Sequence, residues 1–161
     1  MNADELVTLY FRTTLRLANA SGENFEIRPL ENQAAFSADP AVVLAPYQHA
    51  FILTAENPES LGELSPEQNA EATAALRRIL VASGHPFRDC PGYALDSDHV
   101  EPGFAILAHQ EQAAEIQGFA IGLAESFRQN AIFHLDRRGL EIIGALRKDL
   151  DALRPVSINP A

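Results

Sequence analysis

Cysteine and lysine are almost missing from this chain of 161 residues, since each occurs only once, as Cys90 and Lys148. A single cysteine excludes an internal disulfide and suits a reducing compartment, so we expect a cytoplasmic protein. Lys and Arg together number 12 against 22 Asp and Glu, which leaves a net charge of −10. So few basic groups cannot neutralise many phosphates, and we expect neither nucleic-acid binding nor docking on anionic lipid.

Long apolar runs and glycine-rich loops are absent as well. No run approaches the roughly 20 apolar residues of a membrane helix, so we expect no membrane partner. The acidic start of the chain, residues 1–5, lacks the basic and apolar regions of a signal peptide. Neither glycine-rich phosphate-binding motif occurs, and a G-x-S-x-G elbow is missing, so the sequence supports no nucleotide cofactor.

Patterns for metal binding and nucleophilic catalysis are weak. His99-Val100-Glu101 matches the first part of a zinc deaminase motif, but the P-C-x-x-C that must follow it is missing. Cys90 has no activating base that the sequence identifies, so a packed or merely exposed thiol is the better interpretation. We therefore expect no metal and no cofactor. The remaining histidines have no ligand spacing and are interpreted as structural or surface residues: His49, His85, His109 and His134.

Periodic patterning of apolar residues is clear along the chain. Ser65, followed by Pro66 and Gln68, forms a capping box and predicts a helix that ends near Gly84. Apolar stripes predict two further helices, over residues 4–18 and 110–128, and a helical turn is predicted at residues 40–45. Apolar alternation or continuous apolar runs predict strands at residues 24–28, 50–55, 104–108, 131–135 and 140–143, the last two joined as a hairpin. Residues 85–98 are ambiguous.

The order of these elements predicts the fold class. Strands that alternate with long helices and end in a meander indicate an α+β fold. We expect a mostly antiparallel sheet of about five strands, with the long helices packed on one face and a middle part that resembles a split βαβ unit. Residues 1–153 are expected to form one globular domain, followed by a frayed tail at residues 154–161. The oligomeric state stays open.

Polar residues next to apolar segments form the candidate site. Asn57 follows an apolar strand, Asn69 lies on the apolar stripe of a helix, and Gln129 opens a strand. His99 and Glu101 share one face of an extended segment that leads into an apolar strand. A buried polar group without a partner costs about 1–3 kcal/mol, so we predict that Asn57, Asn69 and Glu101 share one hydrogen-bonded cluster near a pocket. This cluster requires the strands at residues 50–55 and 104–108 to run antiparallel.

Four segments, taken in order, resemble a bacterial family of unknown function. They are the T-A-x-N-P segment at residues 54–58, the helix start Glu67-Gln68-Asn69, the E-P-x-F strand at residues 101–104, and residues 127–129, which stand against F-G-Q. The resemblance covers about residues 25–145 and places Asn57, Pro58, Asn69, Glu101 and Gln129 in the shared pattern.

The chain departs from that pattern at two positions. Arg128 stands where the family often has glycine, and Glu56 stands where an aromatic residue is common. Both departures are expected to alter the rim of a pocket. The family has no assigned activity, so the resemblance implies no reaction.

Two functions are compatible with these residues. In the first, Asn57, Asn69, His99 and Gln129 bind a small polar or anionic ligand, and Glu101 serves as general acid or base if chemistry occurs. In the second, the chain is a non-enzymatic protein-interaction or regulatory module, and the same residues only fix loops. A concave site that holds Glu101 together with two of the amides favours the first function.

Overall fold

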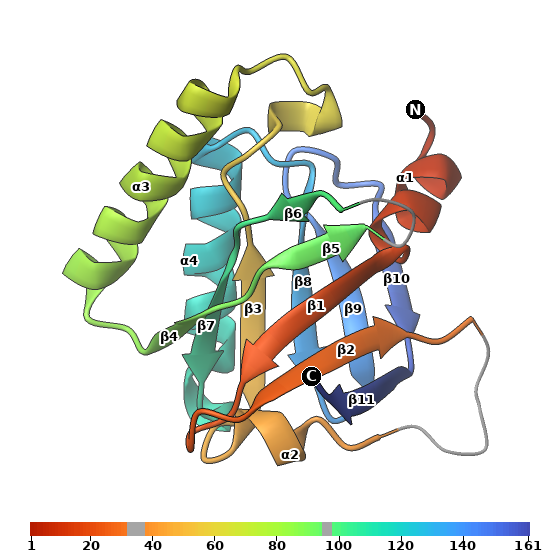
Figure 1. Cartoon of the computed structure of the whole chain (residues 1–161), viewed down its shortest axis with the longest axis vertical. Coiled ribbons are helices and arrows are strands. Elements are labelled where there is room, and N and C mark those ends of the chain that lie inside the picture. Colours follow the sequence, from red (N-terminus) through yellow and green to blue (C-terminus); the bar gives the residue numbers. More distant parts are fainter. Residues whose placement is uncertain (32–37, 95–97) are drawn as a thin grey trace.

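The computed structural model describes residues 1–31, 38–94 and 98–161, which form two sheets and several helices (Figure 1). A five-stranded sheet contains, in spatial order, β11 (Val156–Pro160), β2 (Asn24–Pro29), β1 (Thr13–Ala18), β5 (Gly92–Ala94) and β6 (Val100–Glu101). A six-stranded sheet contains, in spatial order, β10 (Asp151–Arg154), β9 (Gly139–Gly144), β8 (Ala131–Asp136), β3 (His49–Leu53), β7 (Phe104–Ala108) and β4 (Phe87–Asp89).

Four α-helices and two short 3₁₀-helices join these strands. The α-helices are α1 (Ala3–Tyr10), α2 (Ala41–Leu44), α3 (Pro66–Ser83) and α4 (Ala113–Ser126), and the 3₁₀-helices are η1 (Pro58–Ser60) and η2 (Gln110–Gln112). Within the described ranges, no helix is long and apolar enough to cross a membrane. The predicted α+β class, with antiparallel pairing and the long helices on one face of a sheet, is confirmed.

The six-stranded sheet is buried on both faces, as its central strand β3 illustrates. Phe51 and Leu53 face α3 and α4 and pack in one cluster with Leu76 and Ile116. Ile52 points the other way, into the core shared with the five-stranded sheet. Because side chains alternate along a strand, one continuous apolar run serves both cores. The molecule is therefore layered as helices, six-stranded sheet and five-stranded sheet, which Figure 1 shows from the side of the five-stranded sheet.

The capping box and the hairpin are confirmed. Ser65 Oγ accepts a hydrogen bond from the backbone N–H of Gln68, and the Gln68 side chain accepts one from the backbone N–H of Ser65. Gly84 ends α3 with a φ of 74°, a conformation that glycine adopts without strain. The hairpin pairs Leu135 with Leu140 across its turn.

The predicted helix over residues 4–18 is wrong in its second half. The chain leaves α1 after Tyr10, turns, and continues as β1, which pairs with β2 and β5. Leu15 and Leu17 are buried while Arg16 between them is half-buried, so the alternation of a strand prevails over the helical stripe. The β-branched Thr13 and Thr14 favour that outcome, because they fit an extended backbone better than a helix.

Three further expectations are corrected by the strand pairing. One sheet of about five strands is instead two sheets, because the ambiguous residues 85–98 include β4 and β5, which join different sheets. β3 and β7 do not form the parallel strands of a split βαβ unit, since they are antiparallel and pair Leu53 with Phe104. The tail from residue 154 is not frayed: β11 pairs with β2 along its length and Val156 is fully buried.

Candidate functional site

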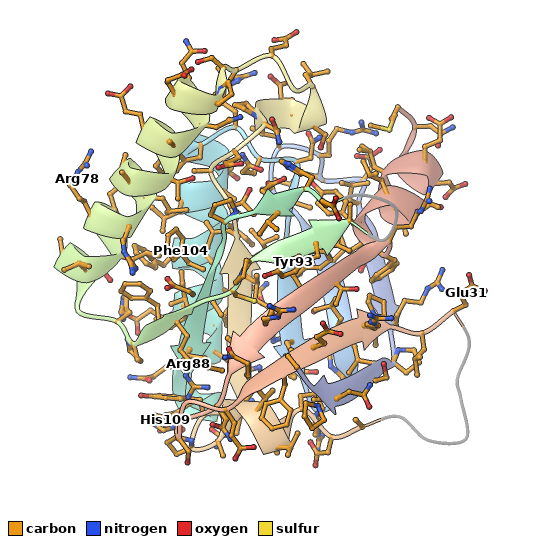
Figure 2. The ribbon with its side chains drawn as sticks, in the orientation of Figure 1. Glu31, Arg78, Arg88, Tyr93, Phe104 and His109 are labelled. Carbon is orange, nitrogen blue, oxygen red and sulfur yellow. The ribbon has the colours of Figure 1, made fainter. Side chains whose placement is uncertain are left out.

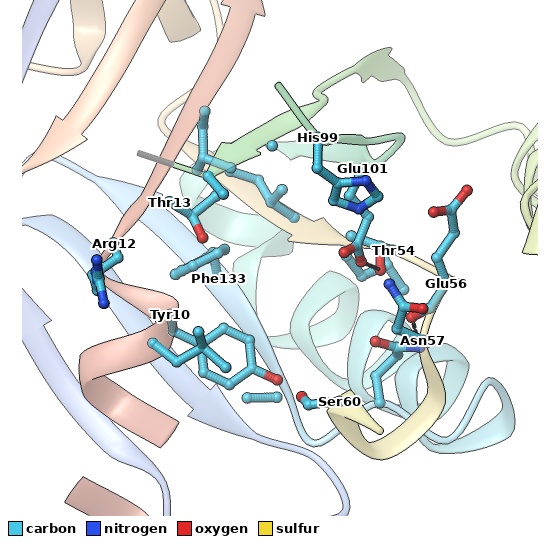
Figure 3. A pocket seen from close by; sticks show the side chains of 18 of the residues that line it. Tyr10, Arg12, Thr13, Thr54, Glu56, Asn57, Ser60, His99, Glu101 and Phe133 are labelled. Atoms are coloured by element: carbon cyan, nitrogen blue, oxygen red, sulfur yellow. Dashed lines mark hydrogen bonds between the residues drawn. The ribbon is translucent and has the colours of Figure 1, made fainter. Parts of the chain in front are cut away.

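A cavity of about 540 Å³ lies between the two sheets, where β3 ends and β6 begins (Figure 3). α1 closes one side and the segment from Thr54 to Gly62 closes another. Its lining includes four of the five residues that the sequence singled out, namely Asn57, His99, Glu101 and Gln129. A volume in this range holds a small organic molecule.

One wall of the cavity is apolar and the other is polar. Leu15 of β1, Ile52 of β3 and Phe133 of β8 contribute apolar surface from both sheets. The Phe133 ring meets the Tyr10 ring edge-on, with the centroids 5.7 Å apart, which fixes α1 against the sheet. Tyr10 therefore lies on the facing wall, on the α1 side (Figure 3). The polar wall presents the following side chains, all labelled in Figure 3: Thr54, Glu56, Asn57, Ser60, His99 and Glu101.

Glu101 reaches this wall because β3 and β7 are antiparallel, as the predicted cluster requires. The end of β3 therefore lies beside the start of the segment that leads into β7. Thr54 Oγ1 donates a hydrogen bond of 2.5 Å to Glu101 Oε1. Gly103 makes the passage from β6 to β7 possible, since a Cβ at this position would lie 2.7 Å from the carbonyl oxygen of Cys90.

The negative charge of Glu101 acts on two different walls of the cavity. The pKa of Tyr10 is raised, mainly because the phenol is buried and further because Glu101 disfavours a second negative charge. The Ser60 hydroxyl and the Ala131 backbone, which hydrogen-bond the Tyr10 oxygen, oppose this rise. The pKa of Glu56 is also raised, first by burial and then by Glu101. The cavity thus disfavours additional negative charge.

Asn69 braces the rim of the cavity rather than lining it. Its Oδ1 accepts a hydrogen bond of 3.1 Å from the backbone N–H of Asn57, and its Nδ2 donates one of 3.3 Å to Asn57 Oδ1. The predicted cluster is therefore two neighbouring pairs, Asn57 with Asn69 and Glu101 with Thr54, at the same end of the sheet.

The backbone that carries Asn57 is strained. Asn57, Glu59 and Ser60 have φ values of 48°, 56° and 61°, in the left-handed region that costs energy for residues other than glycine. Such strain persists only where surrounding contacts enforce it, and it concentrates at functional sites. The pair formed by Asn57 and Asn69 is one of those contacts.

The side chain of Gln129, like that of Asn69, forms hydrogen bonds with backbone groups at the rim of the cavity. Its Nε2 donates hydrogen bonds to the carbonyl oxygens of Glu56, at 3.0 Å, and Phe127, at 3.1 Å. The side chain of Gln129 thereby ties the end of α4 to the segment after β3. Arg128 beside it has a φ of 56° and forms an ion pair with Glu59. Glycine adopts a left-handed backbone without strain. This conformation is therefore compatible with the glycine that the family resemblance predicts at this position.

Cys90 is an unreactive residue in the folded chain. It lines the cavity but is only 1% exposed, and burial raises its pKa to about 12. The thiolate required of a nucleophile is therefore scarce at neutral pH.

Sequence reasoning missed Tyr10, Thr54 and Ser60. Tyr10 lies on the apolar stripe that predicts the helix at residues 4–18, and such a position does not distinguish a site residue from a packing residue. Thr54 and Ser60 occur in a turn-rich segment, where hydroxyl side chains are common. The sequence singled out Glu56 only as a departure from the family pattern that was expected to alter a pocket rim. In the structure Glu56 lines the cavity.

Comparison with known proteins gives a match, and the matched segment contains the residues of the polar wall. Residues 53–132 match the family model described as a protein of unknown function, DUF3293. This segment is similar to the DUF3293 family. The predicted resemblance to a family without an assigned activity is thereby confirmed, over a shorter stretch than residues 25–145. No curated protein and no solved structure gave a significant match. The DUF3293 segment contains Asn57, Asn69, His99, Glu101 and Gln129, whereas Tyr10 on the facing wall comes from outside it.

Proposed function

We propose that this protein binds a small organic molecule in the cavity, with an apolar body against the sheets and a positively charged or hydrogen-bond-donating head group against Glu101. The observation that carries the proposal is the position of Glu101: its carboxylate lies on the polar wall of the cavity, opposite apolar side chains, and its charge acts on both Tyr10 and Glu56. Burial is the main cause of both raised pKa values, and a cationic head group would offset the smaller contribution that the Glu101 charge adds to each.

The charge of the wall bears on the kind of ligand. Glu56 and Glu101 bring two carboxylates to it, and the chain as a whole carries a net charge of −10. Both features oppose an anionic ligand. The sequence left a polar and an anionic ligand open, and we favour a polar one that is neutral or positively charged. The same net charge supports a function without nucleic acid. A cytoplasmic location remains part of this proposal, on the single cysteine.

The polar residues divide into two roles under this proposal. Glu101, Tyr10 and Ser60 offer groups to the ligand directly. Asn69 and Gln129 hold the rim through the hydrogen bonds described above, which is the bracing role that the alternative function assigned to them. A general acid or base function of Glu101 would build on the same binding mode, because any substrate must first place its polar group against this carboxylate.

A matched series of ligands tests the proposal. Phenethylamine, phenethyl alcohol and phenylacetate share one apolar body and differ in the charge of the head group. We expect shifts of backbone amide NMR signals around the cavity, with the amine binding at least about tenfold more tightly than the acid, equivalent to about 1.4 kcal/mol. Preferential binding of the acid, or shifts confined to the outer surface, would refute it.

Three variants show which residues determine the preference for the amine and the binding itself. Glu101→Gln keeps the shape of the side chain and removes its charge, so the preference for the amine should disappear. Glu115→Gln, on an exposed position of α4, removes the same charge far from the cavity and should leave the preference unchanged. Ala131→Leu places extra volume into the cavity lining and should weaken all three ligands alike.

A further inference from the structure

A second polar cluster is buried at the other end of β3, on the face of the six-stranded sheet that carries α4. His49, His134 and Asp136 are only 8%, 5% and 7% exposed. His134 and Asp136 alternate along β8, and the pairing of Ala50 with Leu135 places His49 beside them. Phe51 stacks on the His134 ring, with the centroids 4.5 Å apart, and separates the cluster from the apolar core under α3 and α4.

The outer nitrogen of each histidine has a partner that accepts a hydrogen bond. Gln110 Oε1 lies 2.6 Å from His49 Nε2, and Glu141 Oε1 lies 2.8 Å from His134 Nδ1. Carbonyl and carboxylate oxygens accept hydrogen bonds, so each of these ring nitrogens donates its N–H. A neutral imidazole carries only one N–H, and the inner nitrogens are therefore left with lone pairs.

These two inner nitrogens face each other. His49 Nδ1 and His134 Nε2 are 2.8 Å apart. Two lone pairs at this distance repel unless a cation lies between them. Asp136 Oδ2 approaches the same point, at 3.9 Å from His49 Nδ1 and 3.7 Å from His134 Nε2. Two imidazole nitrogens and one carboxylate oxygen thus converge on one buried position.

We propose that His49, His134 and Asp136 bind a divalent transition-metal ion of the Zn²⁺ type. Imidazole and carboxylate are established zinc ligands, and three protein ligands leave a further position for water. The outer contacts also fit: metal-bound histidines usually donate their second N–H to a carboxylate or carbonyl, as His134 does to Glu141 and His49 does to Gln110. Arg138 holds the Asp136 carboxylate through its Nε, at 3.2 and 3.1 Å from the two oxygens.

The spacing of the ligand atoms suits this ion. A tetrahedral Zn²⁺ with bonds of about 2.0–2.1 Å sets its nitrogen ligands about 3.3 Å apart, so the two rings need to separate by only about half an ångström. This site could not be recognised in the sequence, because its two histidines are 85 positions apart and are brought together only by the pairing of β3 with β8.

Cobalt titration of the full chain tests the site, and it does so independently of the cavity. The purified protein is stripped with EDTA, titrated with Co²⁺, whose visible spectrum reports coordination, and then with Zn²⁺. We expect one Co²⁺ per chain, with the intense bands of a four- or five-coordinate ion, displaced by one equivalent of Zn²⁺. A weak octahedral spectrum, or no saturable binding, would overturn the proposal.

Variants separate this site from incidental metal binding. His134→Gln and Asp136→Asn should abolish the cobalt bands, while His85→Gln and His109→Gln remove histidines outside the cluster and should keep them. Glu141→Gln should lower the affinity about 10- to 100-fold, because it orients a ligand without binding the ion. If His134→Gln does not fold, Asp136→Asn and Glu141→Gln decide the question. Unchanged binding in these variants would contradict the site, as would a histidine ¹⁵N NMR spectrum showing a proton shared between the two rings in the presence of equimolar Zn²⁺.

Discussion

Replacing Asn69 by alanine tests whether the strained rim of the cavity is held by the amide pair. The substitution removes the acceptor for the Asn57 N–H and the donor to Asn57 Oδ1. Two hydrogen bonds at about 1 kcal/mol each give a loss of about 2 kcal/mol. Alanine is the better helix former, which returns about 0.5 kcal/mol. The free energy of unfolding should therefore fall by about 1.5 kcal/mol.

Urea denaturation followed by far-UV circular dichroism measures this change, since the chain contains no tryptophan for fluorescence. Asn69→Asp retains the acceptor and loses only the donor, so it should destabilise less than Asn69→Ala. Glu71→Ala, on an exposed position of the same helix, is the matched control. If Asn69→Ala stays within about 0.5 kcal/mol of wild type, the range of neutral surface substitutions, the pair does not hold the rim.

Three further substitutions test other parts of the structure. Ser65→Ala should lower the free energy of unfolding by about 1 kcal/mol through loss of the cap of α3, and Ser65→Thr should restore most of it. Arg128→Gly should be more stable than Arg128→Ala by about 1 kcal/mol, because φ is 56° there; equal stabilities would contradict that backbone. Glu56→Gln should raise stability at pH 7 but not at about pH 3. The raised pKa of Glu56 means that the folded chain binds its proton more tightly, so wild type loses stability as pH rises through that pKa, and a gain independent of pH would refute this.

The fold was predictable wherever the signal was local. The cap at Ser65, the stop at Gly84 and the continuous apolar run of β3 depend on a few neighbouring residues, and they occur where expected. The residues of β1 are different, because Thr13 and Leu17 fit a helical and an extended pattern in part. The pairing of β1 with β2 and β5 decides between the two. The same holds for β11, whose five residues alone do not predict a strand and which forms one because it pairs with the edge of β2.

Some residues of the candidate site could likewise be predicted from the sequence, and others could not. Asn57 and Glu101 were recognisable because each adjoins an apolar strand, and the antiparallel pairing of β3 with β7 brings them to one end of the sheet. Tyr10 was not recognisable, since its place on the facing wall depends on α1 packing across both sheets. His49 and His134 were out of reach for a similar reason, because no spacing along the chain records the register of β3 with β8. Arg88, labelled in Figure 2, also meets residues remote in sequence, because its guanidinium donates hydrogen bonds to the carbonyl oxygens of Ala18 and Val43.

A crystal structure of the protein soaked with phenethylamine tests the central claim most directly. The account predicts the phenyl ring against the apolar wall and the ammonium within hydrogen-bond distance of the Glu101 carboxylate, on the side that faces Tyr10. An amine bound outside the cavity, or one that lies inside with its ammonium turned away from Glu101, would contradict it.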